Sequence, residues 1–185
     1  MGLNELLKKR RAYRSLKKTK ISKKTVVKLA EAARFSPSCF NNQPWRYVFV
    51  YNEEKLKQMH EALSKGNEWA KKASMIIAVF AKKEEDCMIY DREYYLFDTG
   101  LATSFLILKA TELGFVAHPI AGYSPKKTRE ILGIPDEMTV ISLIIVGKHK
   151  HQIDPLLSEK QRKAEKERPK RKKLDEFVFH NHYQS

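Results

Sequence analysis

The segment from residue 37 to residue 45, Pro-Ser-Cys-Phe-Asn-Asn-Gln-Pro-Trp, brings together side chains suited to binding chemistry. Its two prolines disfavour a helix or a central strand, so we expect a loop. The loop offers a hydroxyl, amides and backbone N–H groups beside an indole, a combination that can hold the polar edge of a flat heteroaromatic ring. An amphipathic helical pattern precedes the loop and an apolar strand pattern follows it, which would hold both of its ends.

Positive charge is concentrated at the two ends of the chain. The net charge is +14; residues 1–28 contain eleven Lys and Arg against one acid, and residues 159–173 contain nine against three. Three explanations fit: both ends hold the phosphate of one small ligand, they bind nucleic acid, or they form a solvated lysine-rich surface. We favour the first, because arginine forks match phosphate and because the aromatic residues form no base-stacking platform among the basic ones.

Length and composition indicate one folded domain. The chain has 185 residues, of which 42% are hydrophobic and 31% charged, as in ordinary globular proteins. The apolar runs at 99–108 and 138–147 are too short to span a bilayer, and the N-terminus lacks the apolar core of a signal sequence, so we expect a cytoplasmic protein without membrane contact. Cys39 and Cys87 give no disulfide framework.

The positions of the histidines do not indicate a metal site. His149 and His151 form one pair and His180 and His182 another, but no carboxylate or cysteine completes a convincing ligand set. We therefore expect no bound metal.

Helical and strand patterns alternate along the chain and predict an α+β domain with three layers, α/β/α. The strands read as buried on both faces of a central sheet. Residues 1–150 would form the core, and residues 151–185 a basic arm ending in a C-terminal strand that docks on a partner subunit. The expected helices are 3–11, 22–36, 53–64, 94–113 and 124–132, and the expected strands are 47–51, 75–81, 115–120 and 140–146.

Several short motifs, in the right order, resemble the nitroreductase family of flavin mononucleotide (FMN) enzymes. The resemblance covers most of the chain, and its most specific part is the loop at 37–45. The motifs are residues 10–14, residues 37–45, Asp98-x-Gly100 with Leu113-Gly114, residues 119–123 with Gly133-Ile134-Pro135, and residues 171–176.

The resemblance implies a homodimer with a mixed sheet flanked by helices and a C-terminal extension swapped onto the partner subunit. FMN would lie in each of two sites between the subunits. NADH or NADPH would reduce flavin N5 by hydride transfer, and a nitroaromatic, a quinone or a similar acceptor would then be reduced in the second half of a two-step (ping-pong) cycle. No side chain is expected to be catalytic, because the cofactor performs the chemistry.

The resemblance also implies which residues bind the cofactor. Arg10 and Arg171 are assigned to the phosphate and the ribityl chain, and Arg14 to the pyrimidine edge of the flavin ring, where a cation stabilises the charge of the reduced flavin. Ser38 and Asn41 would reach the ring from the partner subunit. The full set is Arg10, Arg11, Ala12, Arg14, Pro37, Ser38, Cys39, Asn41, Asn67, Lys71, Ile120, Ala121, Gly122, Arg168 and Arg171.

Two residues depart from the family pattern. Ala12 replaces the usual serine and removes a hydroxyl from the expected phosphate site, and Ala121 replaces a glutamate found in some members. Two other functions stay open at this point: another activity on the same fold, such as flavin remodelling or dehalogenation, and a basic module that binds nucleic acid.

Overall fold

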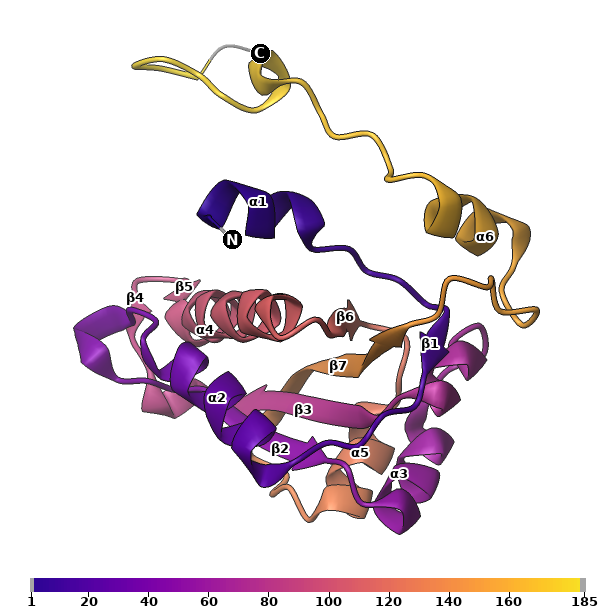
Figure 1. Cartoon of the computed structure of the whole chain (residues 1–185). Helices are drawn as coiled ribbons and strands as arrows, with labels where there is room; N and C mark the ends of the chain where they lie inside the picture. The colour runs from indigo at the N-terminus through magenta and orange to yellow at the C-terminus, as the bar shows by residue number, and fades with distance from the viewer. Residues whose placement is uncertain (1, 184–185) are drawn as a thin grey trace.

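The chain folds into three layers around one sheet. The computed structural model describes residues 2–183, so residues 184–185 of the expected arm lie outside the described part. Helices α2 (Lys23–Arg34) and α4 (Tyr94–Glu112) cover one face of a five-stranded sheet, and α3 (Glu53–Met59) and α5 (Pro125–Leu132) cover the other (Figure 1). The expected three-layer α+β architecture is confirmed.

The sheet is antiparallel at every pairing in the described residues, whereas the resemblance implied a mixed sheet. Strand β7 lies between β3 and β6 and is antiparallel to both, and its end also pairs with β1. The helical connection through α4 leaves β3 and β6 running in the same direction, but β7 separates them, so no parallel neighbours result. The strands are β1 (Leu16–Lys17), β2 (Arg46–Val50), β3 (Met75–Ala81), β6 (Val116–Ile120) and β7 (Thr139–His149).

Strand β3 shows why helices can cover both faces of the sheet. All seven of its residues are buried, as expected for an apolar strand with helices on both faces. Ile76, Ala78 and Phe80 pack in the core on the α3 and α5 side. The intervening Met75, Ile77 and Val79 pack on the α2 and α4 side, which follows from the two-residue repeat of a strand.

Local signals set most of the helix bounds. The side chains of Ser22 and Ser124 accept hydrogen bonds from the backbone of the first turns of α2 and α5, and Gly133 ends α5 in the left-handed conformation. The sequence did not predict α6 (Glu159–Lys166) or the hairpin of β4 (Met88–Ile89) and β5 (Arg92–Glu93). The remaining elements are α1 (Leu3–Lys9) and the 3₁₀ turns η1 (Cys39–Asn41), η2 (His60–Ala62), η3 (Glu68–Lys72), η4 (Lys83–Glu85) and η5 (Leu174–Glu176).

The C-terminal segment divides into two parts. Through α6 and Arg168 it packs back on the N-terminal segment of its own chain, and the part that carries η5 extends away from the body of the molecule (Figure 1). In that second part the structure has the short turn η5 where we expected a strand. Leu174 and Phe177 are exposed there.

Helix α4 has 19 residues and is the longest helix of the described part. One side of it packs under the sheet through Ala102, Leu106 and Ala110. Leu96 and Phe97 of the same helix are exposed. Part of the surface of α4 is therefore apolar and uncovered. In residues 2–183 no helix combines the length and the apolar character needed to cross a membrane.

The buried His118 on β6 makes the stability of the fold depend on pH. Its ring is 6% exposed and lies 4.8 Å from the ring of Trp69, and its Nδ1 is 3.2 Å from the carbonyl oxygen of Tyr13. Burial is the main reason that the pKa of His118 falls from 6.5 to about 4. The folded state therefore keeps the ring neutral at pH values at which the unfolded chain already binds a proton.

We expect His118 to make the protein acid-labile. Because its pKa is lowered in the fold, its contribution is fully present above pH 6.5 and is lost as the pH falls toward 4, an effect on the order of 3 kcal/mol. His118→Gln should flatten the fall in the free energy of unfolding between pH 7 and pH 4.5, measured by urea denaturation. His180→Gln, at an exposed position, is the control and should leave the slope unchanged. The same slope in all three proteins would show that His118 has the same pKa in the folded and the unfolded state.

Candidate functional site

The two ends of the chain meet at one pocket of about 490 Å³. The segment that follows α1 forms one wall, and α6 with the segment that follows it forms the other. Six of the expected binding residues line this pocket: Arg10, Arg11, Ala12, Arg14, Arg168 and Arg171. Ser158, Lys160, Gln161, Ala164 and Pro169 complete the lining, and sequence analysis did not single them out.

The charged side chains that line this pocket are all positive. Burial, followed by repulsion from Arg168 and Arg171, lowers the pKa of Arg10. Among the described residues, no carboxylate forms an ion pair with any of these three arginines. Guanidinium groups gathered around a cavity without an anion are suited to a multiply charged oxyanion such as a phosphate. The pocket therefore fits the phosphate end of a nucleotide cofactor.

Glu165 on α6 shapes the wall that carries the arginines. Its side chain is buried, and its two carboxylate oxygens accept hydrogen bonds from the backbone N–H groups of Arg14 (2.7 Å) and Ser15 (3.1 Å). Arg11 donates in the opposite direction, to the carbonyl oxygens of Ala164 (2.8 Å) and Glu165 (3.2 Å) at the end of α6. These carbonyls have no partner within the helix, so Arg11 satisfies them. The guanidinium of Arg11 is thus engaged in holding α6.

A second contact fixes the same two segments. The hydroxyl oxygen of Ser15 accepts a hydrogen bond from the backbone N–H of Asp154 (3.0 Å). The buried carboxylate of Asp154 pairs with Lys72, and that pair, with the N–H of Leu156, lowers the pKa of Asp154 although burial acts to raise it. The arm is therefore anchored before α6 begins.

A second group of expected residues lies next to Arg14. The guanidinium of Arg14 is 5.8 Å from the ring centroid of Trp69, and the Trp69 indole N–H donates to the Asn67 side-chain oxygen (3.1 Å). The Asn67 amide in turn donates to the carbonyl oxygen of Gly122 (2.9 Å). A Cβ on Gly122 would lie 2.5 Å from the Asn67 amide nitrogen, so this close approach requires the glycine.

The other expected residues near this second group differ in whether their side chains are accessible to a ligand. Ala121 is exposed beside Gly122, and Lys71 is exposed on η3. The side chain of Ile120 is 7% exposed and packs in the core, so only its backbone could meet a ligand. Its carbonyl oxygen already accepts a hydrogen bond from Ser142.

A third group, on the loop at 37–45, lies at the other end of the molecule. The loop is next to β4 and β5, whereas α6 is at the opposite side (Figure 1), and α6 carries part of the lining of the arginine pocket. Of the expected residues, this group holds Pro37, Ser38, Cys39 and Asn41. One chain therefore does not bring the loop and the arginine pocket together.

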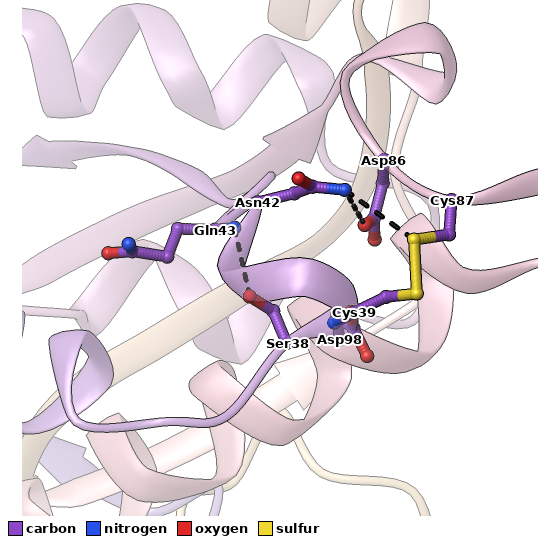
Figure 2. Close-up of a disulfide and its surroundings, with 7 residues drawn as sticks. All are labelled: Ser38, Cys39, Asn42, Gln43, Asp86, Cys87 and Asp98. Atoms are coloured by element: carbon purple, nitrogen blue, oxygen red, sulfur yellow. Dashed lines mark hydrogen bonds between the residues drawn. A yellow bond between two sulfur atoms is a disulfide. The ribbon is translucent and has the colours of Figure 1, made fainter.

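The loop is held by side chains of its own and of its neighbours (Figure 2). The Ser38 hydroxyl accepts the backbone N–H of Gln43 (3.0 Å), and Asp98 on α4 accepts the backbone N–H of Cys39 (2.7 Å). Asp98 is buried, and burial with the nearby Asp86 raises its pKa although the N–H of Cys39 acts to lower it. Asp98 was noted only as part of a motif, and its role in fixing the loop was not predicted.

Cys39 and Cys87 form a disulfide, with Cα atoms 6.1 Å apart (Figure 2). This corrects the expectation that the two cysteines give no disulfide framework. Forty-eight positions separate them in the sequence, and only the fold places the loop after α2 beside the turn before β4. Two cysteines without a secretory pattern carry no signal for such pairing.

The loop contains an unusual run of left-handed residues. Phe40 (φ 46°), Asn41 (φ 59°) and Gln43 (φ 52°) all have positive φ although none is a glycine. Residues in this region cost on the order of 1 kcal/mol each and persist only where surrounding contacts hold them. The hydrogen bonds to Ser38 and Asp98, the disulfide and the hydrogen bond from Asn42 to Asp86 are among those contacts.

Comparisons with known proteins agree with this architecture. A family model described as Nitroreductase family matches residues 7–74 and 63–148. A protein of Archaeoglobus fulgidus, named as a candidate NADH dehydrogenase or NAD(P)H nitroreductase, is 33% identical over 149 residues, which cover 78% of this chain and 84% of that protein. The iodotyrosine deiodinase of Thermotoga neapolitana is 26% identical, with 78% and 87% covered. A solved structure described as an oxidoreductase containing FMN superposes with a TM-score of 0.83 at 27% identity, covering 100% of this chain and 94% of that one.

Proposed function

The chain belongs to the nitroreductase family, and we propose that it is an FMN-dependent oxidoreductase that takes electrons from NADH or NADPH and delivers them to a nitroaromatic, a quinone or a similar small acceptor. The observation that carries this proposal is the pocket that Arg10, Arg168 and Arg171 line together, in which no carboxylate within residues 2–183 forms an ion pair with any of the three. When bound, FMN supplies the chemistry, because it accepts a hydride from the nicotinamide and passes the electrons on. We place the protein in the cytoplasm.

The arginines would hold the phosphate end of FMN. Arg10 and Arg171 come from opposite ends of the chain, so a phosphate between them would also tie the two ends together. Arg168 donates to the carbonyl oxygens of Lys8 and Arg10, which orients the backbone around the pocket and leaves its charge beside the phosphate. Ala12 lines the same pocket, where only its backbone can take part.

Arg14 would lie at the pyrimidine edge of the flavin ring. Glu165 fixes the backbone of Arg14 (2.7 Å), and the Trp69 ring lies under its guanidinium. A cation fixed in this way stabilises negative charge that develops at the ring edge on reduction. Gly122, with Asn67 against it, would let the backbone approach the ring closely.

We further propose that two chains form a homodimer and that the partner's loop at 37–45 completes each site. Two observations support this proposal. The loop lies away from the arginine pocket of its own chain (Figure 1), and α4 exposes Leu96, Phe97 and Phe105, which a second chain would cover. The apolar tail beyond α6, with Leu174 and Phe177 exposed, would dock on the partner.

The visible spectrum of the purified chain tests the proposal. We expect a yellow protein with absorbance near ~450 nm, a dimeric mass in solution, and oxidation of NADH or NADPH only when a nitroaromatic or quinone is present. Released cofactor should be FMN by chromatography. A colourless chain that takes up neither FMN nor riboflavin would refute the assignment of the pocket.

A second candidate activity on the same site is reductive dehalogenation. The similarity to the Thermotoga neapolitana iodotyrosine deiodinase favours it. Release of iodide from iodotyrosine, compared with reduction of a nitroaromatic by the same FMN-loaded preparation, separates the two. Iodide release that exceeds nitroaromatic reduction would replace the first candidate with the second.

A further inference from the structure

The Cys39–Cys87 disulfide joins two segments at the periphery of the molecule. Both cysteines are partly exposed, and neither belongs to the two core clusters. The bond ties the loop at 37–45 to the turn that leads into β4 (Figure 2). Breaking it would therefore leave the packed core and the arginine pocket in place and act on the loop alone.

The loop conformation depends on this bond. Phe40, Asn41 and Gln43 are all left-handed, a conformation that side-chain-bearing residues leave unless contacts hold them. Hydrogen bonds also hold this segment: the N–H of Gln43 donates to Ser38, the N–H of Cys39 donates to Asp98, and the loop backbone forms its own turn hydrogen bonds. The disulfide is the covalent restraint, and when it is lost a smaller fraction of molecules keeps these left-handed residues.

The surroundings of the disulfide suit thiol exchange. The side-chain amide of Asn42 lies 3.5 Å from Cys87 Sγ and also donates to Asp86 (3.2 Å). An N–H donor at this sulfur stabilises the negative charge that it takes up when a thiolate attacks Cys39 Sγ. Partial exposure gives an external dithiol access to the bond. In reducing compartments, disulfides are usually transient and redox-sensing rather than permanent.

We propose that Cys39 and Cys87 form a reversible thiol–disulfide site that sets the affinity for flavin by holding or releasing the loop at 37–45. The reductant is a dithiol. One of its thiolates attacks Cys39 Sγ and displaces Cys87 as a thiolate, and its second thiol then closes the reductant's own disulfide and frees Cys39. Two electrons and two protons pass from the dithiol to the two cysteines. The effect on flavin rests on the proposed FMN function, whereas the effect on the loop does not.

The experiment compares the oxidised and reduced forms of the full-length protein. Diamide treatment gives the oxidised form and anaerobic dithiothreitol the reduced form, with the thiol state read from alkylation and mass spectrometry. FMN dissociation constants are then measured for both, together with hydrogen exchange of the flavin-free protein in peptides covering residues 38–45. Cys87→Ser receives the same treatments and is the matched control, because it removes the bond and leaves the loop sequence intact.

We expect the oxidised protein to bind FMN about tenfold more tightly than the reduced one, because affinity falls with the fraction of molecules in the competent conformation. The amides of Asn41, Asn42 and Gln43 should exchange faster after reduction, and Cys87→Ser should match the reduced form under both treatments. If FMN binds equally to both forms and exchange is unchanged, the inference fails while the proposed function stands. If no form binds FMN but the loop exchanges faster on reduction, the proposed function fails and the thiol–disulfide site stands. Two free thiols after diamide treatment would also overturn the inference.

Discussion

Arg171→Gln is expected to weaken FMN binding by about 10- to 100-fold, the loss expected for a charge-assisted hydrogen bond to phosphate. Arg171 lines the pocket and lies close enough to Arg10 to lower the Arg10 pKa. It is exposed and donates a hydrogen bond to the nearby carbonyl oxygen of Pro169, so the fold should be unaffected. Quenching of flavin fluorescence in a titration gives the dissociation constant.

Riboflavin makes this result specific to the phosphate. Because riboflavin has no phosphate, Arg171→Gln should leave its affinity nearly unchanged. Arg129→Gln is the matched control: it removes the same charge on α5, where Arg129 pairs with the exposed Asp136, and should change neither affinity. An equal loss for FMN and riboflavin would show that Arg171 does not act on the phosphate.

Glu165→Gln is expected to lower both the stability of the fold and the affinity for FMN. The two Glu165 oxygens accept the N–H groups of Arg14 and Ser15. A glutamine keeps one acceptor and turns an NH₂ group toward the other N–H, so one buried donor is left unpaired at a cost of about 1–3 kcal/mol. The loosened backbone would also displace the side chain of Arg14, so FMN and riboflavin should both bind more weakly.

Two measurements check the Glu165 prediction. Urea denaturation gives the change in the free energy of unfolding, and limited proteolysis reports whether α6 leaves the body of the molecule. Glu159→Gln, on the exposed first turn of the same helix, is the control and should behave as the wild type. If Glu165→Gln weakens FMN but not riboflavin, Glu165 acts on the phosphate end rather than on the placement of Arg14.

Much of the fold could be predicted because its signals are local. Ser22 and Ser124 cap their helices, and Gly133 stops one of them. The bounds of β3 agree with the expected 75–81, because polar residues on both sides of the apolar run mark where the buried strand begins and ends. The order of the layers followed from the alternation of these elements.

The features that were missed depend on contacts that are distant in sequence. Helix α6 is almost entirely polar, so no apolar period marked it, although Ser158 and Gln161 form a capping box that could have indicated its start. The antiparallel pairing follows from the insertion of β7 between β3 and β6, which no local pattern records. The disulfide likewise depends on tertiary placement.

The sequence predicted the arginines that line the candidate site, but it did not predict the residues that hold their backbone in place. Arg10, Arg168 and Arg171 line one pocket, as two basic chain ends suggested. Glu165 lies in a stretch of charged residues, and the sequence does not distinguish a buried carboxylate there from a solvated one. Its role appears only when the backbone that it binds is known.

The arginine pocket takes its walls from the two ends of the chain, and this has a consequence for biosynthesis. While the ribosome is still making the protein, the emerging polypeptide carries Arg10 and Arg14 but lacks α6. Under the proposed function, the phosphate of the cofactor can therefore be bound only after α6 and the arginines that follow it have been synthesised. A message truncated shortly before residue 159 would yield a chain that retains the sheet and its covering helices but lacks the α6 wall of the proposed phosphate site.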